Sequence, residues 1–195
     1  MMKIFDLYSV DDVKLEDPGM RHYINLNVKL VLKTKGRERK RFHQAKVNII
    51  ERLINMLQVP GHRGKKHKII THASGKYTKH LNTVIRAFKI IQEKTQQNPI
   101  QVFVKALENA ASRDEITVIE YGGARYPQAV DMSPLRRVNV ALHNIVHGAY
   151  DKSFNKKKTI SETLAEEIIA SAQGSHESFS MSKKNETEKQ ADSAR

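Results

Sequence analysis

Cysteine is absent from this chain of 195 residues. Its absence excludes disulfide bonds, cysteine-ligated iron–sulfur clusters and zinc sites built on thiolates. The sequence also contains no apolar run of about 18 residues and no charged-then-apolar leader, so it indicates neither a membrane-spanning helix nor secretion. A reducing, cytoplasmic location is the default expectation.

Motifs typical of nucleotide-binding and hydrolytic enzymes are missing as well. No G-x-S-x-G elbow, P-loop or G-x-G-x-x-G fingerprint occurs. His143 and His147 have the spacing of a helical metal pair, but Asn144 stands where HExxH has glutamate. Glu166 and Glu167 are adjacent on a predicted helix, so their side chains point about 100 degrees apart and cannot act together on one substrate. We therefore expect no enzyme, no catalytic residue, no metal site and no cofactor.

Acidic residues are scarce relative to basic ones in the middle of the chain. The formal net charge is +13. Five acidic against two basic residues give −3 for residues 1–20, and four of each cancel in residues 174–195, which leaves +16 for residues 21–173. Self-repulsion of this size weakens a compact fold unless a polyanion accompanies it, and nucleic acid is the commonest one. Nucleic-acid binding is thus the leading function class.

The composition fits one domain with extensions at both ends. With 39% apolar residues the chain can bury one hydrophobic core, which we expect within residues 21–173. Residues 1–20 are acidic, end in the turn signal Asp17-Pro18-Gly19, and are expected to lie on the surface as an extension. From Gly174 onward polar residues dominate, so residues 174–195 are predicted to be a polar tail that is mobile unless a partner orders it.

Helical periodicity predicts most of the domain. Asn98 is the expected N-cap of a helix whose first residue is Pro99. Thr159 and Glu162 form the pattern of a capping box at the start of a later helix. The predicted helices span about 45–57, 78–94, 99–110 and 160–173.

A glycine-tipped hairpin is predicted at about 115–132. The run Ile116 to Tyr121 is β-branched and aromatic, and Gly122-Gly123 supplies a two-residue turn. This turn sets the register and places Glu120 opposite Arg125. Pro127 donates no backbone hydrogen bond, which suits an isolated ribbon better than a central strand. The expected fold class is therefore mainly α: a single-domain helical bundle with a protruding two-stranded β-ribbon arm.

The helix after the hairpin opens with two arginines. Ser133 is the predicted N-cap and Pro134 the first helical residue. Arg136 and Arg137 then lie in the first turn, where the helix dipole disfavours cations by about 0.3 to 1 kcal/mol each. A bound phosphate would reverse that sign, because exposed amides and both guanidinium groups would converge on it. The alternative is that both arginines extend into water.

Further cations cluster in loops at helix ends, with few acids among them. Flexible cations on glycine-containing loops suit irregular phosphate surfaces better than regular duplex grooves. One such run is usually only a solvated face, but several separate runs favour nucleic acid. The predicted RNA-binding residues in these runs are Lys33, Lys35, Arg37, Arg39, Lys40, Arg41, Arg63, Lys65, Lys66, Lys68, Lys76, Lys79, Lys156, Lys157 and Lys158.

RNA is favoured over DNA because no helix-turn-helix, zinc finger or basic zipper is present. An architectural DNA-binding protein with a β-arm is the alternative. It predicts apolar wedges or arginines along both strands, whereas Arg125 is the only basic residue from Ile116 to Met132. An RNA-modifying enzyme is a second alternative, and the chain lacks a catalytic constellation for it.

Longer stretches resemble a known family. NPIQVFVKALENAASRDEITVIEYGGARYPQAVDMSPLRRVNVAL, GAY, KKKTISETLAEEIIASAQG and the closing SAR closely resemble small-subunit ribosomal protein seven of archaea and eukaryotes. The resemblance covers about residues 47–195, and its most specific part is the YGGxxYPxAVDxSPxRR core. The tail departs from the family's usual basic, partly apolar terminal helix, because SMSKKNETEKQADSAR has Met181 as its lone large apolar residue.

The resemblance implies a structural protein that binds the 3′ major domain of small-subunit ribosomal RNA and organises assembly of the subunit head. The basic loops, with Arg136 and Arg137, would hold that RNA. Neighbouring head and platform proteins would be its protein partners, on a cytoplasmic ribosome. The arm tip would make a transient contact with exit-site transfer RNA and the messenger RNA path through Tyr121, Gly122, Gly123, Ala124, Arg125 and Tyr126.

Overall fold

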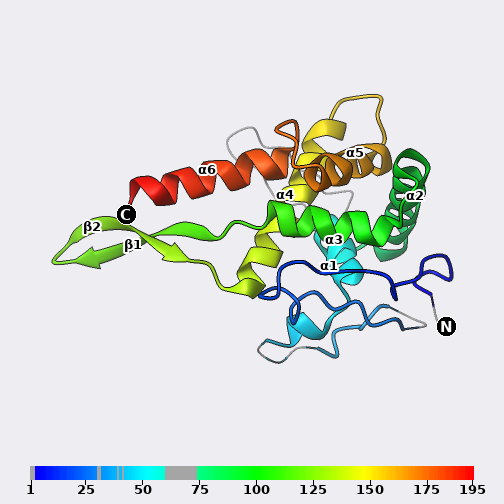
Figure 1. Cartoon of the computed structure of the whole chain (residues 1–195), viewed down its shortest axis with the longest axis horizontal. Helices are drawn as coiled ribbons and strands as arrows, with labels where there is room; N and C mark the ends of the chain where they lie inside the picture. The colour runs from blue at the N-terminus through cyan, green and yellow to red at the C-terminus, as the bar shows by residue number, and fades with distance from the viewer. Residues whose placement is uncertain (1–2, 30–31, 39, 41, 60–73) are drawn as a thin grey trace.

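The computed structural model describes residues 3–29, 32–38, 40, 42–59 and 74–195. The elements follow one another as η1 (His43–Lys46), α1 (Ile49–Gln58), α2 (Tyr77–Thr95), α3 (Pro99–Ala110), β1 (Asp114–Tyr121), β2 (Ala124–Asp131), α4 (Pro134–Ser153), α5 (Ile160–Ala172) and α6 (Phe179–Ser193). Figure 1 shows a group of helices from which the β-ribbon extends. The predicted mainly α class with one β-arm is confirmed. In the described part of the chain, no helix combines the length and apolarity that a membrane crossing requires.

Side-chain caps set where several helices begin. Asn98 accepts the amide two residues on at 3.0 Å at the start of α3. At α5 the Thr159 hydroxyl accepts the Glu162 amide, and the Glu162 carboxylate accepts the Thr159 amide at 3.0 Å. Both predicted starts are confirmed. Ser133 precedes Pro134 at the start of α4 as expected, but its side chain makes no capping hydrogen bond.

Helix α1 begins later than its apolar periodicity predicts. The periodic run starts at Ala45, yet residues 43–46 form the 3₁₀ turn η1 and α1 starts only at Ile49. Asn48 lies between them outside helical backbone, with its side-chain oxygen accepting the Ile50 amide at 2.9 Å and its amide group donating to the Asn27 carbonyl at 3.0 Å. The cap therefore overrides the periodicity, because it satisfies a helix-end donor that an earlier start would leave to water.

Helix α5 packs against α2, α3 and α4, and their apolar faces meet in one core. Phe88 of α2 and Phe103 of α3 are fully buried, with ring centres 6.0 Å apart. Complete burial of such a side chain contributes about 1.5 to 3 kcal/mol relative to leaving it exposed. The core thereby fixes the helix ends that carry the cations.

The arm is a two-stranded antiparallel sheet. Gly122 and Gly123 have φ values of 59 and 81 degrees, a left-handed backbone that glycine adopts without a Cβ clash. The register pairs Glu120 with Arg125, as predicted, and Pro127 lies in a ribbon without further strands. Its residues change from partly buried at the base to exposed at the tip. The predicted arm is confirmed.

The amino-terminal segment is packed more closely than the predicted surface extension. Ile4, Tyr8 and Met20 are buried members of the core, and the Tyr8 ring meets the edge of Phe88 at a centre separation of 6.1 Å. The amides of residues 16 and 17 donate to the Glu108 carboxylate of α3 at 2.8 and 3.0 Å. These apolar residues are too widely spaced to give a periodic signal, so only the tertiary structure reveals that they complete the core.

The carboxyl-terminal segment forms helix α6, which corrects the predicted mobile tail. Figure 1 shows α6 running from the α5 end toward the arm, and it packs on β1, β2, α3 and α4. The Glu188 carboxylate accepts the Arg113 amide at 3.0 Å, and Arg195 pairs with Asp114 at 2.6 Å. Helix α6 therefore lies against the base of the arm.

Small polar side chains dock the start of α6. The fully buried Glu167 carboxylate accepts from the Ser178 hydroxyl at 2.7 Å, the Ser180 amide at 3.0 Å and the Lys152 ammonium at 2.6 Å. The hydroxyl oxygens of Ser171, Ser178 and Ser180 lie 2.7 to 2.9 Å from one another. Because hydrogen bonds between small polar side chains contribute much of this docking, the composition carries no helical signal for it.

Candidate nucleic-acid interface

The first basic segment is anchored to the core at Thr34. The Thr34 amide and hydroxyl donate to Glu51 Oε1 at 2.7 and 2.9 Å, and Glu51 is buried in α1. Lys35 and Gly36 then turn the chain with φ values of 50 and 74 degrees. Lys35 and Arg37 are exposed on that turn. Lys35 and Arg37 were expected on an adaptable loop, but the hydrogen bonds of Thr34 to Glu51 hold their turn in a defined position.

The start of α2 lies beside this turn. Lys33 Nζ is 4.7 Å from the centre of the Tyr77 ring, a cation–π contact that contributes about 0.5 to 1 kcal/mol at exposed sites. Burial, followed by the charge of Glu51, raises the pKa of Tyr77 to about 12, so the ring stays neutral. Lys76 and Lys79 are exposed at the start of α2. We call Lys33, Lys35, Arg37, Lys76 and Lys79 the amino-terminal patch.

The remaining predicted cations divide into two groups. Four are exposed in the structure: Lys40, Lys156, Lys157 and Lys158. Six lie outside the described residues: Arg39, Arg41, Arg63, Lys65, Lys66 and Lys68.

The two arginines at the start of α4 bind carboxylates of this chain. Arg136 contacts Glu115 of β1 twice, with Nε 2.6 Å from Oε1 and Nη2 2.7 Å from Oε2. Hydrogen bonding to Glu115, together with its charge, raises the pKa of Arg136. Arg137 Nη1 lies 3.0 Å from Asp17 Oδ2, and its Nε donates to the Ser112 carbonyl at 3.2 Å. The pair therefore joins α4 to the base of the arm and to the amino-terminal segment.

This arrangement differs from both interpretations of the arginine pair. The guanidinium groups bind different carboxylates, so they neither converge on one anion nor extend unpaired into water. The Arg136 side chain keeps 58% exposure and can contact a phosphate from its open side, whereas Arg137 keeps 13%. RNA contact by these residues stays a prediction. Their role in holding the arm was missed because each carboxylate is far away in sequence.

The two faces of the arm tip differ in chemistry. Strand alternation and the register put Ile119, Tyr121 and Tyr126 on one face, and the two tyrosines are 82% and 58% exposed. On the other face Glu120 Oε2 lies 3.5 Å from Arg125 Nε, and both side chains are exposed. An exposed pair of this kind contributes about 0 to 1 kcal/mol. The tip therefore carries no net charge and presents aromatic surface.

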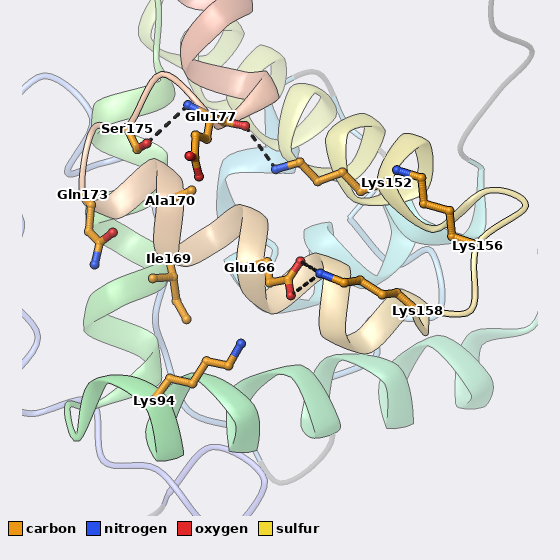
Figure 2. Close-up of a pocket in the computed structure, with 10 residues that line it drawn as sticks. All are labelled: Lys94, Lys152, Lys156, Lys158, Glu166, Ile169, Ala170, Gln173, Ser175 and Glu177. Atoms are coloured by element: carbon orange, nitrogen blue, oxygen red, sulfur yellow. Dashed lines mark hydrogen bonds and ion pairs between the residues drawn. The ribbon is translucent and has the colours of Figure 1, made fainter.

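A second group of lysines surrounds the connection between α4 and α5. Lys158 Nζ donates to both Glu166 oxygens at 2.8 and 3.0 Å, whereas Glu167 binds Lys152. The two adjacent glutamates therefore have different partners. These lysines line a pocket together with Lys94, which lies at the end of α2 (Figure 2). Lys94 was not a predicted site residue, because in the sequence it is only a lysine in the last turn of a helix.

Among the described residues, no group of three or more His, Cys, Asp or Glu side chains could hold a metal ion. The ring centres of His143 and His147 lie 3.6 Å apart on α4. Two imidazoles are fewer ligands than the four of a structural zinc site or the three of a catalytic one. This pair by itself therefore defines no metal centre.

Comparison with known proteins bears on what this basic surface binds. Residues 20–195 match the sequence model of the family described as ribosomal protein S7p/S5e. The chain is 51% identical over 196 residues to the small ribosomal subunit protein uS7 of Nanoarchaeum equitans (strain Kin4-M), covering 100% of this chain and 99% of that protein. Members of this family are structural, non-enzymatic RNA-binding components of the small ribosomal subunit, which acts in translation. Because both matches extend over most or all of its length, the chain belongs to the ribosomal protein S7p/S5e family.

Proposed function

We propose that this chain binds the 3′ major domain of small-subunit ribosomal RNA and organises assembly of the subunit head, while its arm contacts exit-site transfer RNA and the messenger RNA path. Neighbouring head and platform proteins are its protein partners, on ribosomes of the cytoplasm. One observation carries the proposal. The exposed cations of the amino-terminal patch lie on the helical body, and the projecting arm tip has no net charge.

The anchoring of the amino-terminal patch supports binding to folded RNA. The turn that carries Lys35 and Arg37 is tied to Glu51 through Thr34, so little backbone freedom is lost when an RNA surface binds. Folded RNA is recognised largely by its shape and its phosphates. Cations at defined positions suit such a surface.

The two arginines of α4 have unequal parts in this proposal. Arg136 adds a phosphate contact from its exposed side while Glu115 holds it in place. Arg137 acts mainly by position, because its side chain is largely covered and bound to Asp17 and Ser112. Loss of either arginine is expected to disturb the base of the arm.

The chemistry of the tip supports a transient contact with passing RNA. Stable non-specific binding depends on phosphates being neutralised by cations, and the tip offers no net positive charge. Tyr121 and Tyr126 offer exposed rings on one face. Stacking of an unpaired base on an aromatic ring contributes about 1 to 3 kcal/mol, enough for contact without permanent attachment.

Reconstitution of small subunits tests the role of the patch in assembly. The triple variant Lys33→Gln, Lys35→Gln, Arg37→Gln should leave the head incompletely assembled, as measured by probing of the ribosomal RNA. The control variant removes three charges from exposed positions elsewhere, through Lys3→Gln, Lys105→Gln and Lys189→Gln. The control should assemble normally. A normal head in subunits reconstituted without this chain would overturn the assembly role.

A shortened arm tests the role of the tip. Replacement of residues 118–127 by Asn-Gly leaves Thr117 and Gln128, which already pair, on either side of a two-residue turn. It also removes Pro127, which has no amide hydrogen to close such a turn. These subunits should assemble but bind exit-site transfer RNA more weakly. Failure to assemble would contradict the division of roles between body and arm.

A further inference from the structure

A lysine-lined pocket lies at the carboxyl end of α2. Its volume is about 630 Å³, and its walls come from α2, the last turn of α4, α5 and the connections on either side of α5. Figure 2 shows Lys94 reaching in from α2, with Lys152 and Lys156 on the opposite side. We propose that this lysine pocket is a second RNA-binding site, which holds a short stretch of ribosomal RNA backbone apart from the amino-terminal patch.

Internal ion pairs leave two of the four lysines in the pocket available. Lys158 is bound to Glu166, and Lys152 is bound to the buried Glu167 and to the Glu177 carbonyl at 3.3 Å. The ammonium groups of Lys94 and Lys156 have no hydrogen bond or ion pair with any described residue. A backbone phosphate would bind these two groups, while the paired lysines keep the walls in place.

The uncharged part of the lining suits a nucleotide better than a free phosphate ion. Ile169 and Ala170 supply apolar surface for a sugar or a base, and Gln173 supplies an amide. Ser175 Oγ accepts the Glu177 amide at 3.3 Å, which leaves its hydroxyl hydrogen to donate. Single-stranded RNA is typically held by such a combination of cations, apolar contacts and hydrogen bonds to ribose or base edges.

The position of the pocket makes it a separate site. Tyr77, beside the amino-terminal patch, and Lys94 lie at opposite ends of α2. At 1.5 Å per residue these positions are about 25 Å apart, so one phosphate group cannot reach both. The inference rests on the proposed binding of ribosomal RNA and adds that the RNA meets the body at both ends of α2.

Directed hydroxyl-radical probing can test this, because the chain contains no cysteine. Full-length His176→Cys and Ser74→Cys variants would each carry tethered iron–EDTA, at an exposed position beside the pocket lining and near the amino-terminal patch respectively. The probe is a fragment of the 3′ major domain of the ribosomal RNA. We expect each tether to cleave discrete nucleotides and the two sets of nucleotides to differ.

Variants of the pocket complete the test. In the His176→Cys background, Lys94→Gln with Lys156→Gln should abolish the discrete cleavage and reduce the salt slope by roughly 0.7 to 0.9 per lost contact. The control Lys105→Gln with Lys189→Gln removes two exposed charges outside the pocket and should change neither measurement.

The outcomes distinguish the pocket from the proposed function as a whole. Cleavage from the Ser74→Cys tether without cleavage from the His176→Cys tether would overturn the pocket as an RNA site, and an acidic protein segment would become its candidate occupant. Unchanged His176→Cys cleavage in the Lys94→Gln, Lys156→Gln variant would also overturn it. Absence of RNA binding by every variant and by the parent chain would overturn the proposed function itself.

Discussion

Single buried polar residues tie distant segments of this protein together. Arg52 of α1 is 3% exposed and donates to the Tyr23 carbonyl at 2.8 Å and to Asn139 Oδ1 of α4 at 2.7 Å. Burial lowers the pKa of Arg52 to about 10. A hydrogen bond to a charged group contributes about 1.5 to 3 kcal/mol, so loss of either neutral partner of Arg52 would destabilise the fold and such residues constrain which packing is allowed.

Tyr150 provides a prediction about alkaline stability. Its hydroxyl donates to the Leu57 carbonyl at 2.8 Å, and burial raises its pKa from 10.0 to about 12. Because the folded state holds this proton more tightly than the unfolded state, the stabilisation is fully present below pH 10.0 and is lost as the pH rises toward about 12. At about 1.36 kcal/mol per pKa unit, the loss is on the order of 2 to 3 kcal/mol.

The Tyr150→Phe variant should therefore show a flatter decline in the free energy of unfolding over that pH range. It should also be less stable at neutral pH by about 1 to 3 kcal/mol, because the Leu57 carbonyl loses its partner. Denaturant unfolding at a series of pH values measures both effects. Arg52 titrates in the same range with the opposite sign, but it is present in both proteins and cancels in the difference. Tyr121→Phe, at an exposed position, is the control and should decline like the parent chain. If the free energy of unfolding of Tyr150→Phe fell as steeply with pH as that of the parent chain, the alkaline loss of stability could not be assigned to Tyr150.

At the scale of elements, the base of the arm is held from two sides. Helix α4 binds it through Arg136 and Glu115, and α6 binds it through Glu188, which accepts the Arg113 amide, with Arg195 just beyond the helix end pairing with Asp114. Helix α6 in turn depends on the buried Glu167 for its docking. The direction of the arm is therefore coupled to the docking of the carboxyl-terminal helix.

The Gly148→Ala variant should loosen α6. A Cβ atom at this position in α4 would lie 2.8 Å from both Glu167 Cδ and Phe179 Cβ. Overpacking of this kind costs about 1 to 3 kcal/mol, and undocking α6 is the simplest relief. Faster amide hydrogen exchange is expected in α6 and at the base of β1. Asn144→Ala on the same helix is the control, and equal α6 exchange in both variants would argue against the coupling.

At the scale of the whole molecule, positive charge and aromatic surface occupy different regions. The body between residues 21 and 173 carries +16, while the arm tip balances Glu120 with Arg125. Two cationic regions lie at opposite ends of α2. The arm follows the carboxyl end of α3, the next helix along the chain. We therefore expect salt-dependent attachment to RNA through the body, with the arm making a separate contact.

This separation predicts how RNA affinity responds to salt. The shortened arm with Asn-Gly in place of residues 118–127 should have the same salt slope as the full chain, because the removed residues have no net charge. In the variant Lys33→Gln, Lys35→Gln, Arg37→Gln, the slope of log affinity against log salt concentration should be smaller in magnitude by about two to three, at roughly 0.7 to 0.9 per lost phosphate contact. Filter binding of the ribosomal RNA fragment between about 50 and 200 mM salt measures the slope. If the salt slope of the shortened-arm variant were smaller in magnitude by about one or more, the tip would be shown to neutralise phosphates.

Features whose cause is local were predictable from the sequence. The starts of α3 and α5 depend on Asn98 and on the Thr159–Glu162 box, and the arm register depends on the Gly122-Gly123 turn. In each case the interacting groups are a few residues apart, so backbone geometry alone brings them together. The broad basic character of the candidate interface was predictable for a similar reason, because charge counts do not depend on the fold.

Contacts between distant residues were decided only by the tertiary structure. Arg136 binds Glu115, which is 21 residues away in the sequence, and Arg137 binds Asp17, which lies near the amino terminus. Lys94 lines a pocket with Lys156 only because α2 packs against α5. The sequence by itself determined most of the helices, the arm and the sign of the charge, through short-range hydrogen bonding and composition, but not the carboxyl-terminal helix α6. Packing decided which cations are already paired and which are not, because only the tertiary structure brings a carboxylate from a distant segment within reach of a given cation.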